Sequence, residues 1–140
     1  MAPDPLHILL VDDHDESLLV LKRLLERCGH TVATARTYAE AMDAAGRRRC
    51  DLLISDVGLP DRSGLELMQE MRARYGVKGI ALSGYTDDQD ARNSQDAGFA
   101  RHLNKPVVFT DLTTAIQEVA GWRPPADAEP TPDAAWQSPN

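Results

Sequence analysis

The stretch DLLISDVGLPDRSG, residues 51–64, determines how the rest of this chain is arranged. Its apolar run at 52–54 is typical of a strand buried on both faces, and Asp56 stands where the run ends. Glycine and proline residues then indicate a loop, and Ser63 with Glu66 has the pattern of a capping box that starts a helix. Because an open α/β sheet binds ligands at the carboxyl ends of its strands, Asp56 lies where a ligand is expected.

Strand and helix patterns alternate along the rest of the chain, which favours an α/β fold with a parallel sheet. We predict strands at residues 7–11, 31–35, 52–56, 79–83 and 100–104. Apolar stripes predict the first, third and fifth helices: Leu18, Leu21, Leu25 and Cys28 before a stop at Gly29; Leu65, Met68, Met71 and Tyr75 before a stop at Gly76; and Leu112, Ile116 and Val119. The second helix is predicted from Thr37 and Glu40, a second capping-box pattern, to about Gly46, and the fourth spans residues 86–97. The fourth helix is largely polar, so we expect it to dock weakly.

The strand patterns also predict the order of the sheet. Strands 7–11, 52–56 and 79–83 are continuous apolar runs, which belong in the centre. Strands 31–35 and 100–104 alternate apolar with polar residues, which is typical of edges. Right-handed crossovers then favour the order 2-1-3-4-5, whose topological switch point lies between the first and third strands.

The composition excludes several classes of function. A net charge of −7 over 140 residues argues against a nucleic-acid partner. No apolar run approaches the length needed for membrane insertion, and the first residues lack the pattern of a signal peptide. Cys28 and Cys50 suggest neither a metal cluster nor a disulfide framework, so we expect a cytoplasmic protein.

The domain boundaries follow from the same pass along the chain. Residues 1–5 are predicted to be a short N-terminal extension and residues 6–121 a single folded domain. From residue 122 the sequence is proline-rich without apolar periodicity, so we expect 122–140 to be a disordered tail.

Polar side chains end or follow four of the predicted strands on one edge of the sheet: Asp12, Asp13, Asp56, Ser83 and Lys105. Each alone has an ordinary structural explanation, such as a helix cap or a solvated lysine. Together, however, three acids within several ångströms repel by roughly a few kcal/mol per pair. A cation would relieve this repulsion, and Mg²⁺ suits oxygen ligands of this kind.

This set of residues suits phosphoryl transfer. A carboxylate can attack phosphorus to give an acyl phosphate, and Asp56 is the best candidate because it ends the central strand. Mg²⁺, Lys105 and Ser83 could then neutralise or bind the phosphoryl oxygens, while Asp12 and Asp13 are better placed to hold the metal.

The sequence resembles a response-regulator receiver domain over residues 6 to about 121. The matching pieces are LLVDD at 9–13, Asp56 with Leu59, Pro60 and Gly64, ALSG at 81–84, and Lys105 with Pro106. The SGY and HLNKPV segments are particularly similar to receivers fused to hybrid sensor histidine kinases. The resemblance implies a flavodoxin-like (βα)5 three-layer sandwich with a sheet of order 2-1-3-4-5.

The resemblance also implies a mechanism. Asp56 would accept a phosphoryl group from a phosphohistidine of a histidine kinase or a histidine-phosphotransfer protein. Asp13, Asp56 and the Gly58 carbonyl would bind Mg²⁺ directly, and Asp12 would act largely through water. Ser83 would carry the switch hydroxyl. Lys105 would sense the phosphate, and its peptide bond to Pro106 would be cis.

The sequence departs from the family pattern at two places. His102 stands where the switch residue is usually Tyr or Phe. Its imidazole could follow Ser83 inward on activation, or it could be an exposed edge-strand histidine without a switching role. Val57 and Gly58 offer nothing bulky to shield an acyl phosphate.

Three other classes of protein compete with the receiver interpretation. A flavodoxin-like cofactor module would need a glycine-rich phosphate loop after the first strand, where this chain has the acidic run 12–16. An aspartate-based phosphatase would need a second Asp where Gly58 stands. A phosphorylation-independent interaction module stays open as the alternative.

As a receiver, the chain would not be a turnover enzyme, because it promotes only its own phosphorylation and dephosphorylation. We expect a monomer or weak dimer. Since the sequence after Gly121 leaves no room for an effector domain, we expect a single-domain regulator, a relay intermediate or a receiver excised from a hybrid kinase.

Overall fold

A computed structural model describes residues 6–84 and 88–121. Strands and helices alternate in this order: β1 (His7–Val11), α1 (Asp15–Arg27), β2 (Thr31–Ala35), α2 (Tyr38–Arg47), β3 (Leu52–Asp56), α3 (Gly64–Tyr75), β4 (Lys78–Ser83), α4 (Asp88–Ala97), β5 (Arg101–Asn104) and α5 (Phe109–Ala120). The predicted extension and tail, and the predicted first two residues of the fourth helix, lie outside the described residues.

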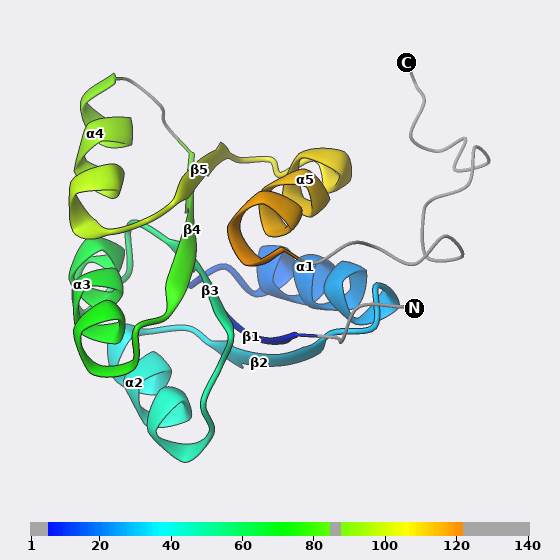
Figure 1. The fold of residues 1–140 in the computed structure, drawn as a ribbon, viewed down its shortest axis with the longest axis horizontal. Helices are drawn as coiled ribbons and strands as arrows, with labels where there is room; N and C mark the ends of the chain where they lie inside the picture. The colour runs from blue at the N-terminus through cyan, green and yellow to red at the C-terminus, as the bar shows by residue number, and fades with distance from the viewer. Residues whose placement is uncertain (1–5, 85–87, 122–140) are drawn as a thin grey trace.

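The described strands form a parallel sheet of order β2-β1-β3-β4-β5, which confirms the predicted topology. Every residue of β3 is buried, whereas β2 and β5 are partly exposed, because the central strand has neighbours on both sides and a helical layer on each face. Helices α1 and α5 cover one face, and α2, α3 and α4 cover the other (Figure 1). The chain is therefore a three-layer α/β sandwich.

Each helical layer encloses its own hydrophobic core against the sheet. Alternate side chains of β3 pack into the two cores. Leu52 and Ile54 pack in the cluster that contains the apolar faces of α1 and α5. Leu53 packs in the cluster that contains α2 and α3. Since successive strand residues point to opposite faces, a continuous apolar run was needed at this position in the sheet.

The structure corrects some details of the predicted helices. Helix α2 ends at Arg47, next to the predicted stop near Gly46, which confirms that boundary. The predicted stripe of α3 omitted Leu67, which is fully buried, while Leu65 and Tyr75 are only partly buried. The stripe is therefore rotated toward Leu67, because α3 is covered by α2 and α4 as well as by the sheet.

The helix starts set the geometry of the site. Ser63 and Glu66 form the predicted capping box at α3. At α2, the Thr37 hydroxyl accepts a hydrogen bond from the Glu40 N–H. The Glu40 carboxylate accepts one from the backbone N–H of Arg36 and not from that of Thr37, so the box is incomplete. None of the helices in the described parts of the chain is long and apolar enough to cross a membrane. The thiols of Cys28 and Cys50 are free and buried.

Candidate functional site

Three predicted site residues meet at the carboxyl edge of the sheet. Asp12 follows β1, Asp56 ends β3 and Lys105 follows β5. The Lys105 Nζ lies 2.8 Å from Asp12 Oδ2 and 3.1 Å from Asp56 Oδ2. Parallel strands bring these residues together although 93 positions separate the first from the last in sequence (105 − 12).

Burial makes this contact electrostatically strong. Asp12 is 0% exposed and Asp56 is 8% exposed, so water screens their charges poorly. Burial by itself lowers the pKa of Lys105, but its hydrogen bonds to Asp12 and Asp56 outweigh that effect and raise the pKa. Lys105 is therefore held as a cation between two carboxylates.

A group of potential metal ligands lies beside the lysine. Asp12, Asp13, His14 and Asp56 each offer a ligand atom, and these atoms all lie within 4.8 Å of one another. The Asp13 Oδ1 atom is buried and accepts no hydrogen bond from the residues that the structure describes. One lysine cannot neutralise three acids, so the donor set fits a divalent cation. Sequence reasoning had missed His14, whose adjacency to the acid pair was the available signal.

The loop after β3 is held closely against the end of the sheet. The Val57 N–H donates to the Leu82 carbonyl at 3.0 Å, and the Gly64 N–H donates to the Val57 carbonyl at 2.7 Å. The Gly58 N–H donates to Asp56 Oδ1 at 3.2 Å, which orients that carboxylate. A Cβ on Gly64 would overlap the Asp56 carbonyl oxygen, so glycine is required where α3 starts.

The far side of this loop is tied to α2. The Asp61 carboxylate accepts hydrogen bonds from the Tyr38 and Ala39 N–H groups at 2.8 and 3.0 Å. Its bond from Tyr38 and further backbone bonds lower the pKa of Asp61. The Arg62 guanidinium lies over the Tyr38 ring, 4.2 Å from its centroid. Sequence reasoning missed these contacts, because Asp61 caps a helix 23 residues earlier and not its own.

Ser83 and His102 lie on the neighbouring strands. Ser83 ends β4, and its carbonyl accepts a hydrogen bond from the Lys105 N–H at 2.8 Å. His102 is partly buried, and both its ring nitrogens are enclosed without a hydrogen-bond partner in the described residues. The exposed edge-strand interpretation of His102 was therefore wrong about its exposure. A cavity of about 190 Å³ beside it is lined also by Ser94 and Phe99.

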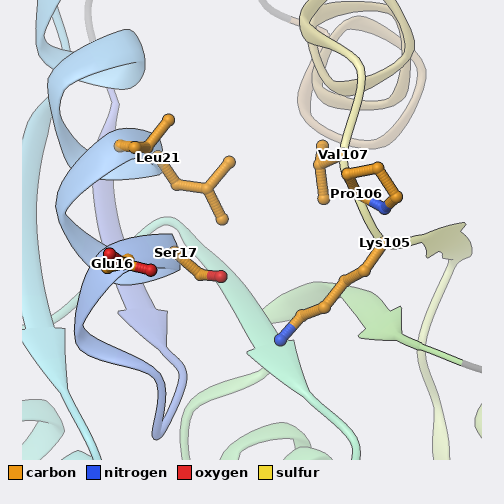
Figure 2. Close-up of a pocket in the computed structure, with 7 residues that line it drawn as sticks. Glu16, Ser17, Leu21, Lys105, Pro106 and Val107 are labelled. Atoms are coloured by element: carbon orange, nitrogen blue, oxygen red, sulfur yellow. The ribbon is translucent and has the colours of Figure 1, made fainter.

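A second cavity, of about 240 Å³, opens between α1 and the segment after β5. It is lined by Glu16, Ser17, Val20, Leu21, Lys105, Pro106 and Val107. Figure 2 shows Ser17 and Leu21 on α1 across from Pro106 and Val107, with Lys105 extending between the two walls. The Lys105–Pro106 peptide bond is cis, as the resemblance implied.

A parallel sheet of this order, with acids after β1 and at the end of β3 and a lysine after β5, defines a receiver-type signalling domain. The chain belongs to the response regulator receiver domain family, whose model matches residues 8–117.

The relatives include regulators of two kinds. The transcriptional regulatory protein KdpE of Mycobacterium tuberculosis is 36% identical over 110 residues, which cover 79% of this chain and 49% of KdpE. The sensory/regulatory protein RpfC of Xanthomonas campestris is 30% identical over 121 residues, covering 82% of this chain and 16% of RpfC. This chain thus spans about half of one relative and about a sixth of the other.

Solved structures agree with this assignment. A CheY-like response regulator receiver domain protein from Methanospirillum hungatei is 33% identical, with a TM-score of 0.75. The match covers 82% of this chain and 93% of that protein. The predicted flavodoxin-like fold and the receiver assignment are therefore confirmed.

Proposed function

We propose that Asp56 is the phosphoacceptor of this receiver domain. The donor is a phosphohistidine of a histidine kinase or a histidine-phosphotransfer protein. The observation that carries the proposal is the position of the Asp56 carboxylate, whose Oδ2 faces the Lys105 ammonium at 3.1 Å beside two further acids. A carboxylate oxygen attacks phosphorus, the phosphorus–nitrogen bond breaks, and its electron pair returns to the imidazole.

The residues around Asp56 divide the work of this step. The Gly58 N–H donates to Asp56 Oδ1 and the Lys105 ammonium donates to Oδ2, so both carboxylate oxygens are held in a defined orientation. The Lys105 ammonium can neutralise a phosphoryl oxygen, and Ser83 at the end of β4 can bind another. When bound, Mg²⁺ supplies charge neutralisation to the transferring group. Its proposed ligands are Asp13, Asp56 and the Gly58 carbonyl, with Asp12 acting largely through water.

The proposed response to phosphorylation passes through Ser83 and His102. Ser83 would move toward the phosphoryl group, and His102 would rearrange with it. Two observations support a change there. The enclosed nitrogens of His102 carry no compensating hydrogen bond from the described residues, and the cavity of about 190 Å³ beside them leaves space.

The cavity between α1 and the segment after β5 is the proposed docking surface for the phosphodonor. Val20 lines this cavity and is 56% exposed, and Leu19 and Val108, next in sequence to lining residues, are also exposed apolar side chains. Lys105 lines the same cavity, so a partner seated there reaches the edge where Asp56 lies. We also propose that the protein is cytoplasmic, has no nucleic-acid partner, does not insert into a membrane, and is a monomer or weak dimer.

Residues 6–121 form the proposed domain, which promotes its own phosphorylation and dephosphorylation and does not turn over an external substrate. A phosphorylation-independent interaction module is the competing function. It is disfavoured because Asp12, Asp56 and Lys105 are all present and in contact.

Intact mass measured after incubation with a small phosphodonor and Mg²⁺ tests the proposal. The wild type should gain one phosphoryl group, and Asp56→Asn should gain none. Asp51→Asn is the matched control, since Asp51 lies at the opposite end of β3, where it accepts a hydrogen bond from the His7 N–H. Acid-stable label that persists in Asp56→Asn would indicate a hydroxyl acceptor and contradict the proposal.

A further inference from the structure

His14 occupies the N-cap position of α1 but makes no capping hydrogen bond with its side chain. Ser, Thr, Asp or Asn would be the usual choice there. The ring instead turns toward the acid pair, with its Nδ1 atom 3.3 Å from Asp12 Oδ1 and 3.2 Å from Asp13 Oδ1. The His14 N–H also donates to Asp12 Oδ1 at 2.9 Å, which fixes the turn that places the ring.

These separations suit a hydrogen bond or an ion pair, and they also suit atoms that share a metal ion. With metal–ligand bonds of about 2.1 Å, adjacent ligands lie about 3.0 Å apart in an octahedral site and about 3.4 Å apart in a tetrahedral one. The Lys105 ammonium contacts the Oδ2 atoms of Asp12 and Asp56, so Asp12 Oδ1 faces His14 and not the lysine. The nitrogen therefore lies on the side of the acids that Lys105 does not neutralise.

We propose that His14 Nδ1 is a nitrogen ligand of the divalent-cation site, so that the site takes transition-metal ions such as Ni²⁺ and Zn²⁺ as well as Mg²⁺. The proposal rests on the proposed function, in which these acids hold a divalent cation. Imidazole nitrogen suits Zn²⁺ and Ni²⁺, whereas Mg²⁺ prefers oxygen ligands. The side chain is 69% exposed, which leaves the ring free to adjust to a metal.

The competing explanation is that His14 serves only as a counter-charge to crowded carboxylates. A lysine would serve equally well in that role, but a lysine ammonium has no lone pair to give to a metal. His14→Lys therefore separates the two explanations, and His14→Ala removes both functions.

Isothermal titration of the full chain with Mg²⁺ alone and with Ni²⁺ alone tests the proposal. Most sites favour Ni²⁺ over Mg²⁺ to some degree, so the informative quantity is the ratio of the two affinities in each variant. We expect that ratio to fall about tenfold or more in both His14→Ala and His14→Lys. An unchanged ratio in His14→Ala would overturn the proposal, as would full retention of the ratio in His14→Lys.

Nitrogen-15 NMR with Zn²⁺ supplies a direct readout of ligation. We expect the His14 Nδ1 resonance to shift on Zn²⁺ addition in the wild type, and the shift to be lost in Asp13→Asn. Zn²⁺ binding at the acids without that shift would overturn the proposal. Asp56 labelling of the wild type with Mg²⁺ is measured in parallel. If Asp56 is labelled but the Ni²⁺-to-Mg²⁺ affinity ratio is unchanged in the His14 variants, only the His14 ligand is refuted. If the wild type neither binds Mg²⁺ nor is labelled, the proposed function is refuted as well.

Discussion

The Lys105 ammonium lies 2.8 Å from the carboxylate of Asp12, which is entirely buried. The ion pair joins the segment after β1 to the segment after β5, on either side of the central strand. Since the same ammonium also contacts Asp56, one cation partly balances two carboxylates. This arrangement makes the stability of the apo protein depend on Lys105.

Replacing Lys105 by Met should lower the free energy of unfolding by about 1–3 kcal/mol, because Asp12 and Asp56 then lose their shared cation. Mg²⁺ should restore more stability to Lys105→Met than it adds to the wild type. Urea unfolding with and without Mg²⁺ measures both effects. Lys78→Met, at the exposed start of β4, is the control and should change stability little. A Lys105→Met protein as stable as the wild type would contradict the role of the ion pair.

Mg²⁺ should raise the melting temperature of the wild type, since a metal that binds only the folded state stabilises it by mass action. Asp13→Asn should reduce the shift, because it removes a charged ligand whose Oδ1 is buried without a hydrogen bond from the described residues. Thermal melts over a Mg²⁺ concentration series measure this. The proposed metal ligands would be wrong if Asp13→Asn kept the whole shift.

Gly64→Ala should destabilise the fold by about 1–3 kcal/mol and weaken Mg²⁺ binding, because the new Cβ overlaps the Asp56 carbonyl oxygen. Helix propensity alone predicts the opposite sign, a gain of up to about 1 kcal/mol at this helical position. Gly58→Ala is the steric control, since its Cβ meets no heavy atom within 4 Å in the described structure. A stabilised Gly64→Ala would show that the loop can move away at little cost.

His30 should make the protein less stable in acid. Burial lowers its pKa from 6.5 to about 4, and its Nδ1 accepts a hydrogen bond from the Leu6 N–H, which requires the neutral ring. Below about pH 6.5 the unfolded chain therefore binds a proton that the folded chain does not. The contribution of His30 to the free energy of unfolding is complete above that pH. It falls as the pH drops toward 4, and at pH 5 the loss is about 2 kcal/mol.

Urea unfolding at about pH 7.5 and about pH 5 measures this effect. His30→Gln removes the titrating group and should flatten that part of the pH dependence. If the variant loses as much stability between the two pH values as the wild type, other groups cause the acid sensitivity.

The sequence alone determined the fold and the identity of most site residues. Continuous apolar runs at β1, β3 and β4 placed those strands in the centre, because only strands covered on both faces can be apolar throughout. That order, with right-handed crossovers, is enough to place Asp12 and Asp56 at the same ends of neighbouring strands.

Only the tertiary structure decided which side chains touch. The Asp61 carboxylate caps α2 although the two are 23 residues apart in sequence. Gly64 is required because its backbone closely approaches the Asp56 carbonyl. No local sequence pattern encodes either contact. His14 is adjacent to the acid pair in sequence, yet its ring direction depends on the turn fixed by Asp12. The partly buried ring of His102 depends likewise on how β5 packs against its partner strand β4 and against α4, which the alternation that marked β5 as an edge does not encode. Local patterns encode which face of an element is apolar, but contacts between elements depend on how those faces pack in three dimensions.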